Sequence, residues 1–371
     1  MTGASGGEPR ATVFLLGPLV GLSGGDMHAL RLVDDWERAS PGSISLVAPA
    51  TMRDHLPARS RHALRAVRSP LDGRLLPMPV YFVNVSFRAL LALRTAPRSD
   101  VVVAASHFFH DVIPCAVLAR LWGARTVAYV YHLVEEERRS AGLRSRVSLA
   151  LERFSVMLLR RAGALVLVDN PATARALVAR GFPETTFAMT ANAYDPWEPL
   201  PPRAPASTPT LAFCGRLTEE KGVWDALELA RRMPDARLVL LGDGPLRNEV
   251  RDRVTAMGLR NVELRGFVSE QEKWRVLREA HVFVAPSREE GWGIAVGEAL
   301  TAGIPAVVYD LPAYAHFGAR VRRVDVGNVR EMEEAVRETL AGAGASSDIS
   351  DLPRWSDVLE NERAVMVAPS G

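Results

Sequence analysis

Short apolar runs alternate with longer amphipathic stretches along the first 190 residues of the chain. The runs cover 11–20, 43–50, 100–106, 126–132 and 164–170, and a helix-like segment follows each of them. Strand-length apolar runs that alternate with amphipathic helices are typical of βα units, whose strands pair in parallel. The pattern therefore predicts an N-terminal α/β domain with a parallel sheet over residues 1–190.

The alternation stops at 191–210, a proline-rich segment too irregular for a strand or a helix, which predicts an interdomain linker. It resumes in runs at 210–217, 236–244, 261–268, 280–287 and 304–310, so a second parallel α/β domain is predicted over 211–345. The remainder, 346–371, is a flexible stretch followed by helical spacing, with Trp355, Leu359 and Met366 as the expected buried positions. We expect this last helix to pack back on the N-terminal domain.

The composition is that of an ordinary globular protein. A length of 371 residues exceeds what one hydrophobic core usually supports, which agrees with two domains. Apolar residues make up 48% and charged residues 24%, which excludes a wholly disordered or fibrous chain. The apolar stretch 11–22 is interpreted as a first strand rather than a signal peptide, and no run approaches the roughly 18 to 20 apolar residues that cross a bilayer.

The charge is nearly balanced overall but uneven along the chain. The formal net charge is +2, whereas residues 51–100 contain nine arginines and three acidic residues. Such a basic face would suit an anionic lipid surface or a phosphorylated substrate. A solvated surface in an arginine-rich protein explains it equally well. We expect no nucleic-acid partner, and any membrane contact is expected to be peripheral and to involve this basic N-terminal domain.

Lysine and cysteine are both rare. The lysines are Lys221 and Lys273, so the other 43 of the 45 basic residues are arginines. Because a compact ammonium and a planar guanidinium are not interchangeable at a tight site, a lysine that persists at a motif position is informative. The two cysteines, Cys115 and Cys214, form no metal-spaced pair, and a reducing cytoplasm suits them.

Several familiar motifs are absent from the sequence. The nearest string to GxGxxG is GDGPLR from Gly242, which has Arg247 in place of the third glycine. Two glycines alone indicate dinucleotide binding only weakly. A Walker loop, HExxH and GxSxG do not occur, and no paired-aspartate motif for a metal stands out. The chemistry is therefore expected to come from other residues, without a metal site.

A glycine-rich segment follows the apolar run 280–286. It begins at the carboxyl end of a predicted parallel strand, which is where doubly wound sheets bind ligands. Gly291 and Gly293 would let the backbone approach a ligand, and 294–302 is predicted to be a helix whose N-terminus points at this loop. Glu290 in the loop and Glu298 in the helix would then accept hydrogen bonds from separate polyol groups, such as a sugar ring and a ribose.

The strings EGWGIAVGEAL and GIPAVV, with two glutamates eight positions apart, resemble the donor-binding motif of glycosyltransferase family 4. CGRLTEEKG, VLLGDGPLR and NVELRGFVSEQE resemble further elements in that family's order. The resemblance covers the C-terminal half and, more weakly, the N-terminal half. It implies the GT-B fold, in which two Rossmann-like, doubly wound parallel-sheet domains face a central cleft and a C-terminal helix crosses back to the N-terminal domain.

The resemblance also implies roles for individual residues in the C-terminal half. The diphosphate of the donor would be held by Arg216 and Lys221, beside Gly215. Glu290 would contact the transferred sugar and Glu298 the ribose hydroxyls. The remaining implied donor contacts are backbone ones, from Gly291, Trp292 and Gly293 to the sugar and from near Val268 to the base. Trp292 departs from the phenylalanine more usual there, which puts the choice of sugar in doubt.

Each of these roles has a plainer alternative. Glu290 and Glu298 are surface acids in that interpretation, Lys221 is a solvated turn residue, and Arg216 forms a salt bridge at the end of a strand. The occurrence of all four in one order favours the functional interpretation.

In the N-terminal half, Gly24 and Gly25 follow the first predicted strand. A glycine-rich loop at this place in the family approaches the diphosphate from the opposite wall of the cleft. The family often has a histidine near the reacting sugar, and His107 is favoured here over His110 and His132. His132 is equally well explained as a buried core histidine.

The function implied by the resemblance is that of a retaining, metal-independent glycosyltransferase. Its co-substrate would be a nucleotide sugar, with UDP or GDP as the expected carrier and no other cofactor. The acceptor would be a glycan, a lipid-linked sugar or a small molecule, and the protein would be cytoplasmic or peripheral to the inner face of the membrane. Two alternatives remain: a nucleotide-sugar epimerase or phosphorylase of the same architecture, and a non-catalytic accessory subunit that binds sugar nucleotides.

Overall fold

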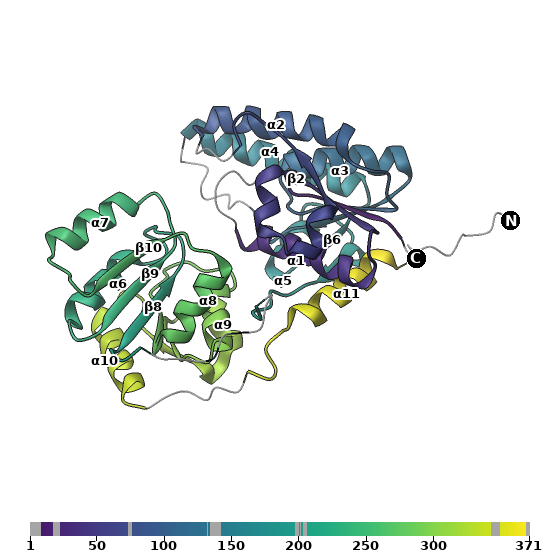
Figure 1. Ribbon diagram of the computed structural model, residues 1–371. Coiled ribbons are helices and arrows are strands. Elements are labelled where there is room, and N and C mark those ends of the chain that lie inside the picture. Colours follow the sequence, from purple (N-terminus) through teal and green to yellow (C-terminus); the bar gives the residue numbers. More distant parts are fainter. Residues whose placement is uncertain are drawn as a thin grey trace. The chain divides into compact units, whose positions relative to one another are not determined.

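The computed structural model of the chain describes residues 9–17, 23–72, 76–131, 133, 142–196, 200, 202, 206–342 and 349–368. The chain divides into two compact units (Figure 1). Unit 1 combines Met1–Asn192 with Trp355–Gly371, and unit 2 is Ala193–Arg354. The chain therefore passes from one unit to the other twice.

Unit 1 is built on a sheet of seven parallel strands in the described part of the chain, in the order β3-β2-β1-β4-β5-β6-β7. Each strand is short, and the central ones are buried on both faces, as parallel sheets require. The strands are β1 (Ala11–Phe14), β2 (Ile44–Pro49), β3 (Leu64–Val67), β4 (Val101–Ala104), β5 (Arg125–Tyr129), β6 (Leu165–Val168) and β7 (Phe187–Met189).

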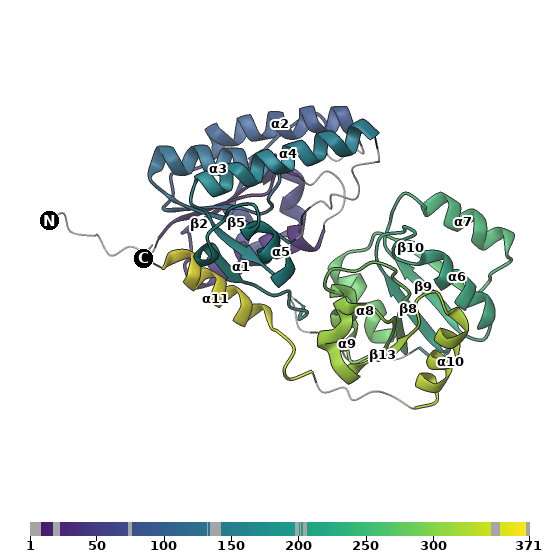
Figure 2. The ribbon, with the colours of Figure 1, turned by 180° about the vertical axis from the view of Figure 1, so that it is seen from behind.

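Helices cover both faces of this sheet. One layer contains α2, α3 and α4, while α1 and α11 pack against each other on the opposite face (Figures 1 and 2). The helices of unit 1 are α1 (Gly24–Ala39), α2 (Met78–Thr95), α3 (Phe109–Trp122), α4 (Gly142–Arg161), α5 (Pro171–Val178) and α11 (Trp355–Val367), with 3₁₀ helices at Ala50–His55, Ala58–Ala63 and Glu184–Thr186.

The last helix of the chain belongs to unit 1, as predicted. Trp355, Leu359 and Met366 are 8%, 2% and 0% exposed, so all three expected positions are buried. A charged residue that the pattern did not single out, Glu362, is buried as well. Its carboxylate accepts hydrogen bonds from the Tyr129 hydroxyl at 2.5 Å and from the Thr190 hydroxyl, and it lies 2.9 Å from His28 Nε2. These buried polar contacts hold α11 on unit 1, together with its three buried apolar side chains.

Unit 2 repeats the architecture with six parallel strands in the order β10-β9-β8-β11-β12-β13 among its described residues. Its strands are β8 (Thr210–Cys214), β9 (Arg237–Leu241), β10 (Val262–Gly266), β11 (Val282–Ala285), β12 (Ala306–Tyr309) and β13 (Val321–Val324). Its helices are α6 (Val223–Arg232), α7 (Arg247–Ala256), α8 (Glu270–Glu279), α9 (Ile294–Thr301) and α10 (Val329–Leu340), with a 3₁₀ segment at Pro312–Arg320.

The strand orders confirm the predicted pair of doubly wound parallel sheets, and each sheet has one point where the winding reverses. In unit 1 this point lies between β1 and β4, and in unit 2 between β8 and β11. Loops that leave the carboxyl ends of these two strands diverge, which opens a crevice suited to a ligand.

The predicted linker 191–210 contributes to the core of unit 2. Tyr194 is buried against α9, and its hydroxyl lies 2.9 Å from His316 Nε2. Elsewhere, none of the described helices is both long enough and apolar enough to cross a membrane.

Candidate functional site

Two loops meet at the reversal point of unit 2. The first follows β8 and contains Gly215, Arg216 and Lys221, and the second follows β11 and leads to Glu290. The backbone N–H of Arg288 in the second loop donates to the carbonyl of Glu220 in the first at 2.7 Å. Two of the predicted site segments, which are far apart in sequence, are thus joined at one edge of the sheet.

The side chains of these two loops pair directly. Lys221 Nζ lies 2.7 Å from Glu290 Oε2, and both side chains are about four-fifths buried, with 21% and 19% exposed. The other carboxylate oxygen of Glu290 accepts the Gly291 backbone N–H at 3.2 Å. Both oxygens are therefore oriented by a partner, and each retains a lone pair that can accept a hydrogen bond from a ligand hydroxyl.

Arg216 is placed differently from Lys221. Its side chain is exposed, and its carbonyl accepts the Thr218 N–H at 2.9 Å in the same turn. The next residue, Leu217, is buried and donates its N–H to the carbonyl of Asp243 at 3.0 Å, which ties the turn to the end of β9. The backbone on each side of Arg216 is therefore held, while its guanidinium is open to solvent and available for an anion.

The second predicted glutamate also has a lysine partner. Lys273 Nζ, on α8, lies 2.6 Å from Glu298 Oε1 on α9 and 2.9 Å from Glu270 Oε1. Burial opposes the charge of this ammonium, but Glu298 and Glu270 outweigh it, so the pKa of Lys273 is raised. The sequence reasoning gave Lys273 no role. The rarity of lysine was the signal that could have found it, because both lysines of the chain pair with the two glutamates of the motif.

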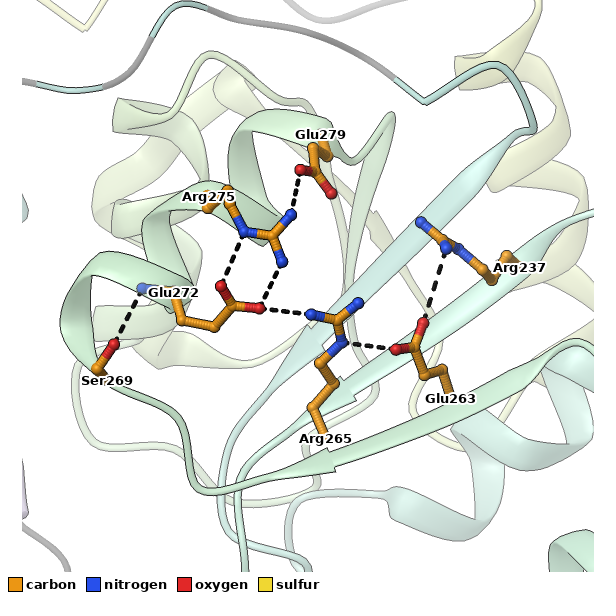
Figure 3. Close-up of polar contacts among 7 residues, drawn as sticks. All are labelled: Arg237, Glu263, Arg265, Ser269, Glu272, Arg275 and Glu279. Atoms are coloured by element: carbon orange, nitrogen blue, oxygen red, sulfur yellow. Dashed lines mark hydrogen bonds and ion pairs between the residues drawn. The ribbon is translucent and has the colours of Figure 1, made fainter.

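Val268 lies between β10 and α8, in a short segment that charged side chains anchor at both ends. Figure 3 shows the network: Arg265 on β10 contacts Glu263 at 2.6 Å and also Glu272 on α8. Glu272 receives a second arginine, Arg275, from its own helix at 2.8 Å. Isolated surface pairs contribute little, but this network links two elements. It limits the positions that the backbone of Val268 can take.

The start of α9 combines an open backbone with an aromatic wall. Gly291 is exposed, and a Cβ added there would meet no heavy atom within 4 Å. Gly293 caps the helix at φ +81°, and a Cβ there would lie 2.8 Å from the Tyr314 ring, so glycine is required. The Trp292 ring packs on His316 with the ring centroids 4.9 Å apart. The free N–H groups of the first helical turn adjoin this wall.

In unit 1, Gly24 and Gly25 lie in the first turn of α1 and not in the loop that was expected. Ser23 caps the helix, because its hydroxyl accepts the Asp26 N–H at 3.2 Å while the Asp26 carboxylate accepts the Ser23 N–H at 2.7 Å. This reciprocal capping starts the helix at Gly24, so both glycines fall in its first turn. Gly25 also makes room for Tyr131, whose ring would lie 2.8 Å from an added Cβ. A diphosphate contact from these residues stays a prediction.

His107 follows β4 at the reversal point of unit 1, and it is only 2% exposed. Its Nε2 lies 3.0 Å from Glu152 Oε1 on α4, a carboxylate that is itself buried. The contact with this buried carboxylate orients the imidazole. Its proposed place near the reacting sugar stays a prediction. His132 lies outside the described residues.

His110 and Asp111 form a buried polar group beside His107. Burial, with Arg88 and His107 nearby, lowers the pKa of His110 to about 3. Burial raises the pKa of Asp111 to about 7, although hydrogen bonds from the Ser106 hydroxyl and the Leu16 N–H oppose the shift. His110 is therefore a neutral imidazole at neutral pH. Asp111 ties the end of β1 to α3, since Leu16 N–H donates to it at 2.8 Å.

The basic stretch of the N-terminal half does not form one solvated face. Arg88 is fully buried, and its guanidinium donates to the Leu16 carbonyl at 2.8 Å and pairs with Asp72. Arg59 pairs with Asp34 at 2.6 Å. These arginines are neutralised within unit 1, whereas Arg94 lies exposed at the end of α2. Sequence reasoning missed the buried role of Arg88, because no local pattern distinguishes it from an exposed arginine.

The doubly wound parallel sheets of two units, with a helix from the chain's end returned to the first, define the GT-B class of α/β proteins. Residues 201–348 match the family of glycosyl transferases group 1. The matched part of the chain holds both lysine–glutamate pairs.

Two known proteins show how far the likeness in sequence extends. The chain is 35% identical over 104 residues to 2-deoxystreptamine N-acetyl-D-glucosaminyltransferase of Niallia circulans, covering 26% of each protein. It is 30% identical over 267 residues to the putative colanic acid biosynthesis glycosyltransferase WcaL of Escherichia coli (strain K12), which is 67% of this chain and 64% of WcaL. Both matches thus span less than two thirds of the relative.

Among solved structures, Anabaena HepE in complex with UDP-glucose has a similar fold. The TM-score is 0.65 over 96% of this chain and 95% of HepE, at 13% sequence identity. A likeness at this identity shows the fold.

Proposed function

We propose that the protein is a retaining glycosyltransferase that moves a sugar from a nucleotide-sugar donor to an acceptor hydroxyl. The observation that carries the proposal is the pairing of Lys221 with Glu290 at 2.7 Å across the reversal point of unit 2. There, an ammonium for phosphate and a carboxylate for sugar hydroxyls adjoin a helix N-terminus. A nucleotide sugar carries a diphosphate next to sugar hydroxyls, which suits all three.

Each paired side chain has a role in this proposal. Lys221 and the exposed Arg216 neutralise the diphosphate, together with the free N–H groups at the start of α9. Glu290 has both oxygens oriented by Lys221 and Gly291, and it accepts hydrogen bonds from the transferred sugar. Glu298, held by Lys273, accepts from the ribose, and the backbone near Val268 contacts the base.

The proposed chemical step uses these charges. The bond between the anomeric carbon and the diphosphate oxygen breaks, and a bond to the acceptor oxygen forms on the same face of the sugar. The acceptor proton passes to the departing diphosphate. Cations that stabilise the negative charge developing on the diphosphate lower the barrier. Since Arg216 and Lys221 supply such charge, we propose that the reaction does not require a metal ion.

We further propose a UDP- or GDP-linked donor and a glycan, lipid-linked or small-molecule acceptor. HepE was crystallised with UDP-glucose, and a relative from Mycobacterium tuberculosis is named as GDP-mannose-dependent, which supports these two carriers. The cytoplasm is the proposed compartment, because Cys115 and Cys214 are free thiols and lie in the interior or close to it.

A donor screen tests the proposal. UDP-, GDP-, ADP- and dTDP-sugars are added separately, and the thermal unfolding midpoint is followed, since a bound ligand stabilises the native state by mass action. We expect one nucleotide sugar to raise the midpoint and to be slowly hydrolysed. The released sugar, observed by NMR, should be the same anomer as in the donor.

The outcomes separate the alternatives. Binding without hydrolysis or transfer would indicate a non-catalytic subunit, and no binding would remove the donor assignment. Release of the opposite anomer would contradict retention. Loss of all activity in excess chelator would contradict metal independence.

A further inference from the structure

The helices α2, α3 and α4 form one layer over a face of the sheet of unit 1 (Figures 1 and 2). Their inner sides contribute Ala89, Cys115 and Val156 to the core beneath, and α3 packs against both neighbours. The opposite side of each helix therefore points away from the sheet. Together these sides make one outer face, called here the outer helical face.

An apolar row runs along α2 on this outer helical face. Val80, Val83, Phe87 and Leu90 are 38%, 69%, 45% and 65% exposed. At 3.6 residues per turn, these positions lie within about 80° of one another and extend over about 15 Å. Arg94 continues the same row and is exposed. A helix of a globular protein normally turns such a stripe inward.

The neighbouring helices extend the apolar surface. Val117 and Leu121 on α3 are 41% and 71% exposed, and Val147 and Phe154 on α4 are exposed as well. Eight large apolar side chains from three adjacent helices are thus exposed on one layer. Single exposed hydrophobic residues are ordinary, but a contiguous group of them marks an interaction surface.

The charges on this layer all have one sign at the surface. The three helices contain two acidic residues, Asp111 and Glu152, and both are buried with partners inside unit 1. Among the described side chains of these helices, the exposed charged ones are all arginines: Arg94 on α2, Arg120 on α3, and Arg146, Arg153, Arg160 and Arg161 on α4. The outer helical face is therefore apolar and cationic at once.

We propose that the outer helical face docks on an anionic lipid bilayer. The apolar side chains would enter the interfacial region, and the arginines would meet lipid phosphates. A second copy of the chain fits less well, since a symmetric contact would place arginines against arginines. The bilayer satisfies both the apolar and the cationic character. This interaction is separate from the donor site and does not depend on the proposed function.

Vesicle sedimentation tests the proposal. The full chain is mixed with vesicles of phosphatidylcholine alone or with an equal part of phosphatidylglycerol, at low and at physiological salt. We expect the wild type to sediment with the anionic vesicles and at least about tenfold less with the neutral ones. The double variants V83Q/L90Q and R146E/R153E should each reduce anionic binding about tenfold.

Matched controls come from unit 2. Val326, which is 46% exposed, and Arg251, whose side chain is 65% exposed, offer V326Q and R251E as changes of the same kind at another surface. Both should sediment like the wild type. All variants should keep the wild-type thermal midpoint, because the altered side chains are exposed.

Three results would overturn the proposal. One is a wild type that stays in solution with anionic vesicles at low salt. Another is vesicle binding by V83Q/L90Q or R146E/R153E at the wild-type level. The third is a wild-type dimer, seen by analytical ultracentrifugation without vesicle binding, that the same substitutions dissociate. That third result would make the outer helical face a contact between two copies.

Discussion

Lys221 and Glu290 are each other's partner in the structure, and in the proposed function both contact the donor. As an ion pair that is about one-fifth exposed, they contribute about 1 kcal/mol or less to stability. We expect Lys221→Ala and Glu290→Ala to shift the thermal midpoint by only a few degrees and to lower kcat/KM about 10²-fold or more. The measurement is steady-state kinetics with the donor found by the screen.

Two exposed charged residues provide the controls for these variants. Arg231→Ala and Glu289→Ala remove exposed charges of the same sign outside the pair, so both should keep near wild-type kinetics. Wild-type turnover by the Lys221 or the Glu290 variant would show that the pair is structural.

Lys273 is a second single residue with a testable role, and it acts by holding Glu298. It holds Glu298 at 2.6 Å in a place where both side chains are 13% exposed. We expect Lys273→Met and Glu298→Gln each to weaken nucleotide binding about tenfold, and the double variant to be no weaker than the poorer single one. Isothermal titration calorimetry of the four proteins gives the coupling energy.

Arg251→Met is the control for Lys273, because Arg251 is an exposed cation of unit 2 on α7, outside the proposed donor site. It should bind the nucleotide normally. Additive losses in the double variant would instead mean that Lys273 and Glu298 act independently.

His110 predicts a pH dependence of stability. Above pH 6.5 the imidazole is neutral in both the folded and the unfolded state. Below pH 6.5 the imidazole of the unfolded chain takes up a proton. The imidazole of the folded chain does not, because its pKa is lowered to about 3. Its contribution is therefore present above pH 6.5 and is lost on acidification towards pH 3. From pH 6.5 to 5 the wild type should lose about 2 kcal/mol more than His110→Gln, at about 1.4 kcal/mol per pH unit.

Asp111 works in the opposite direction over much of this range, since its pKa is raised to about 7 and the folded state keeps its proton. Only the difference between wild type and variant in urea unfolding isolates His110. His62→Gln, at a histidine whose side chain is 60% exposed, is the control. Parallel pH profiles for wild type and His110→Gln would contradict the expectation.

At the scale of elements, α9 connects the site to the core of unit 2. Its inner face approaches Tyr194 so closely that a Cβ added at Gly297 would lie 2.2 Å from the ring. We expect Gly297→Ala to overpack this contact and to lower the free energy of unfolding by about 1–3 kcal/mol. Urea unfolding followed by tryptophan fluorescence measures it.

Gly291→Ala is the paired control for stability, because an added Cβ there meets open space. Its free energy of unfolding should stay within about 0.5 kcal/mol of the wild type. Equal losses for the two variants would mean that the contact between α9 and Tyr194 is not tight.

The elements are also the level at which the sequence was most informative. The predicted helix at 294–302 is α9, Ile294–Thr301, and the predicted runs all contain strands. Periodicity is a local property, so it survives without knowledge of the fold. Gly24 and Gly25 were misplaced in a loop, because the capping by Ser23 and Asp26 competes with the usual preference of glycine for loops.

For the whole molecule, the return of α11 to unit 1 depends on the buried carboxylate of Glu362. Glu362→Ala would leave His28, Tyr129 and Thr190 without this acceptor, so we expect a loss of about 3–5 kcal/mol and fast hydrogen exchange in α11. Hydrogen exchange with mass spectrometry reports on α11 directly.

Glu360→Ala, on the same helix but exposed, should exchange like the wild type. Slow exchange in α11 of Glu362→Ala would show that its apolar contacts, such as Leu359 and Met366, are sufficient to hold the helix.

The sequence by itself determined the two parallel α/β units, the last helix and the segments of the candidate site, because hydrophobic periodicity and motif spacing are properties of residues close together in sequence. The tertiary structure alone decided which charges pair. Lys221 and Glu290 are 69 positions apart, and His28 and Glu362 are 334 apart. It also decided that the apolar side of α2 faces outward. Such contacts depend on how distant segments pack, which local sequence patterns do not predict.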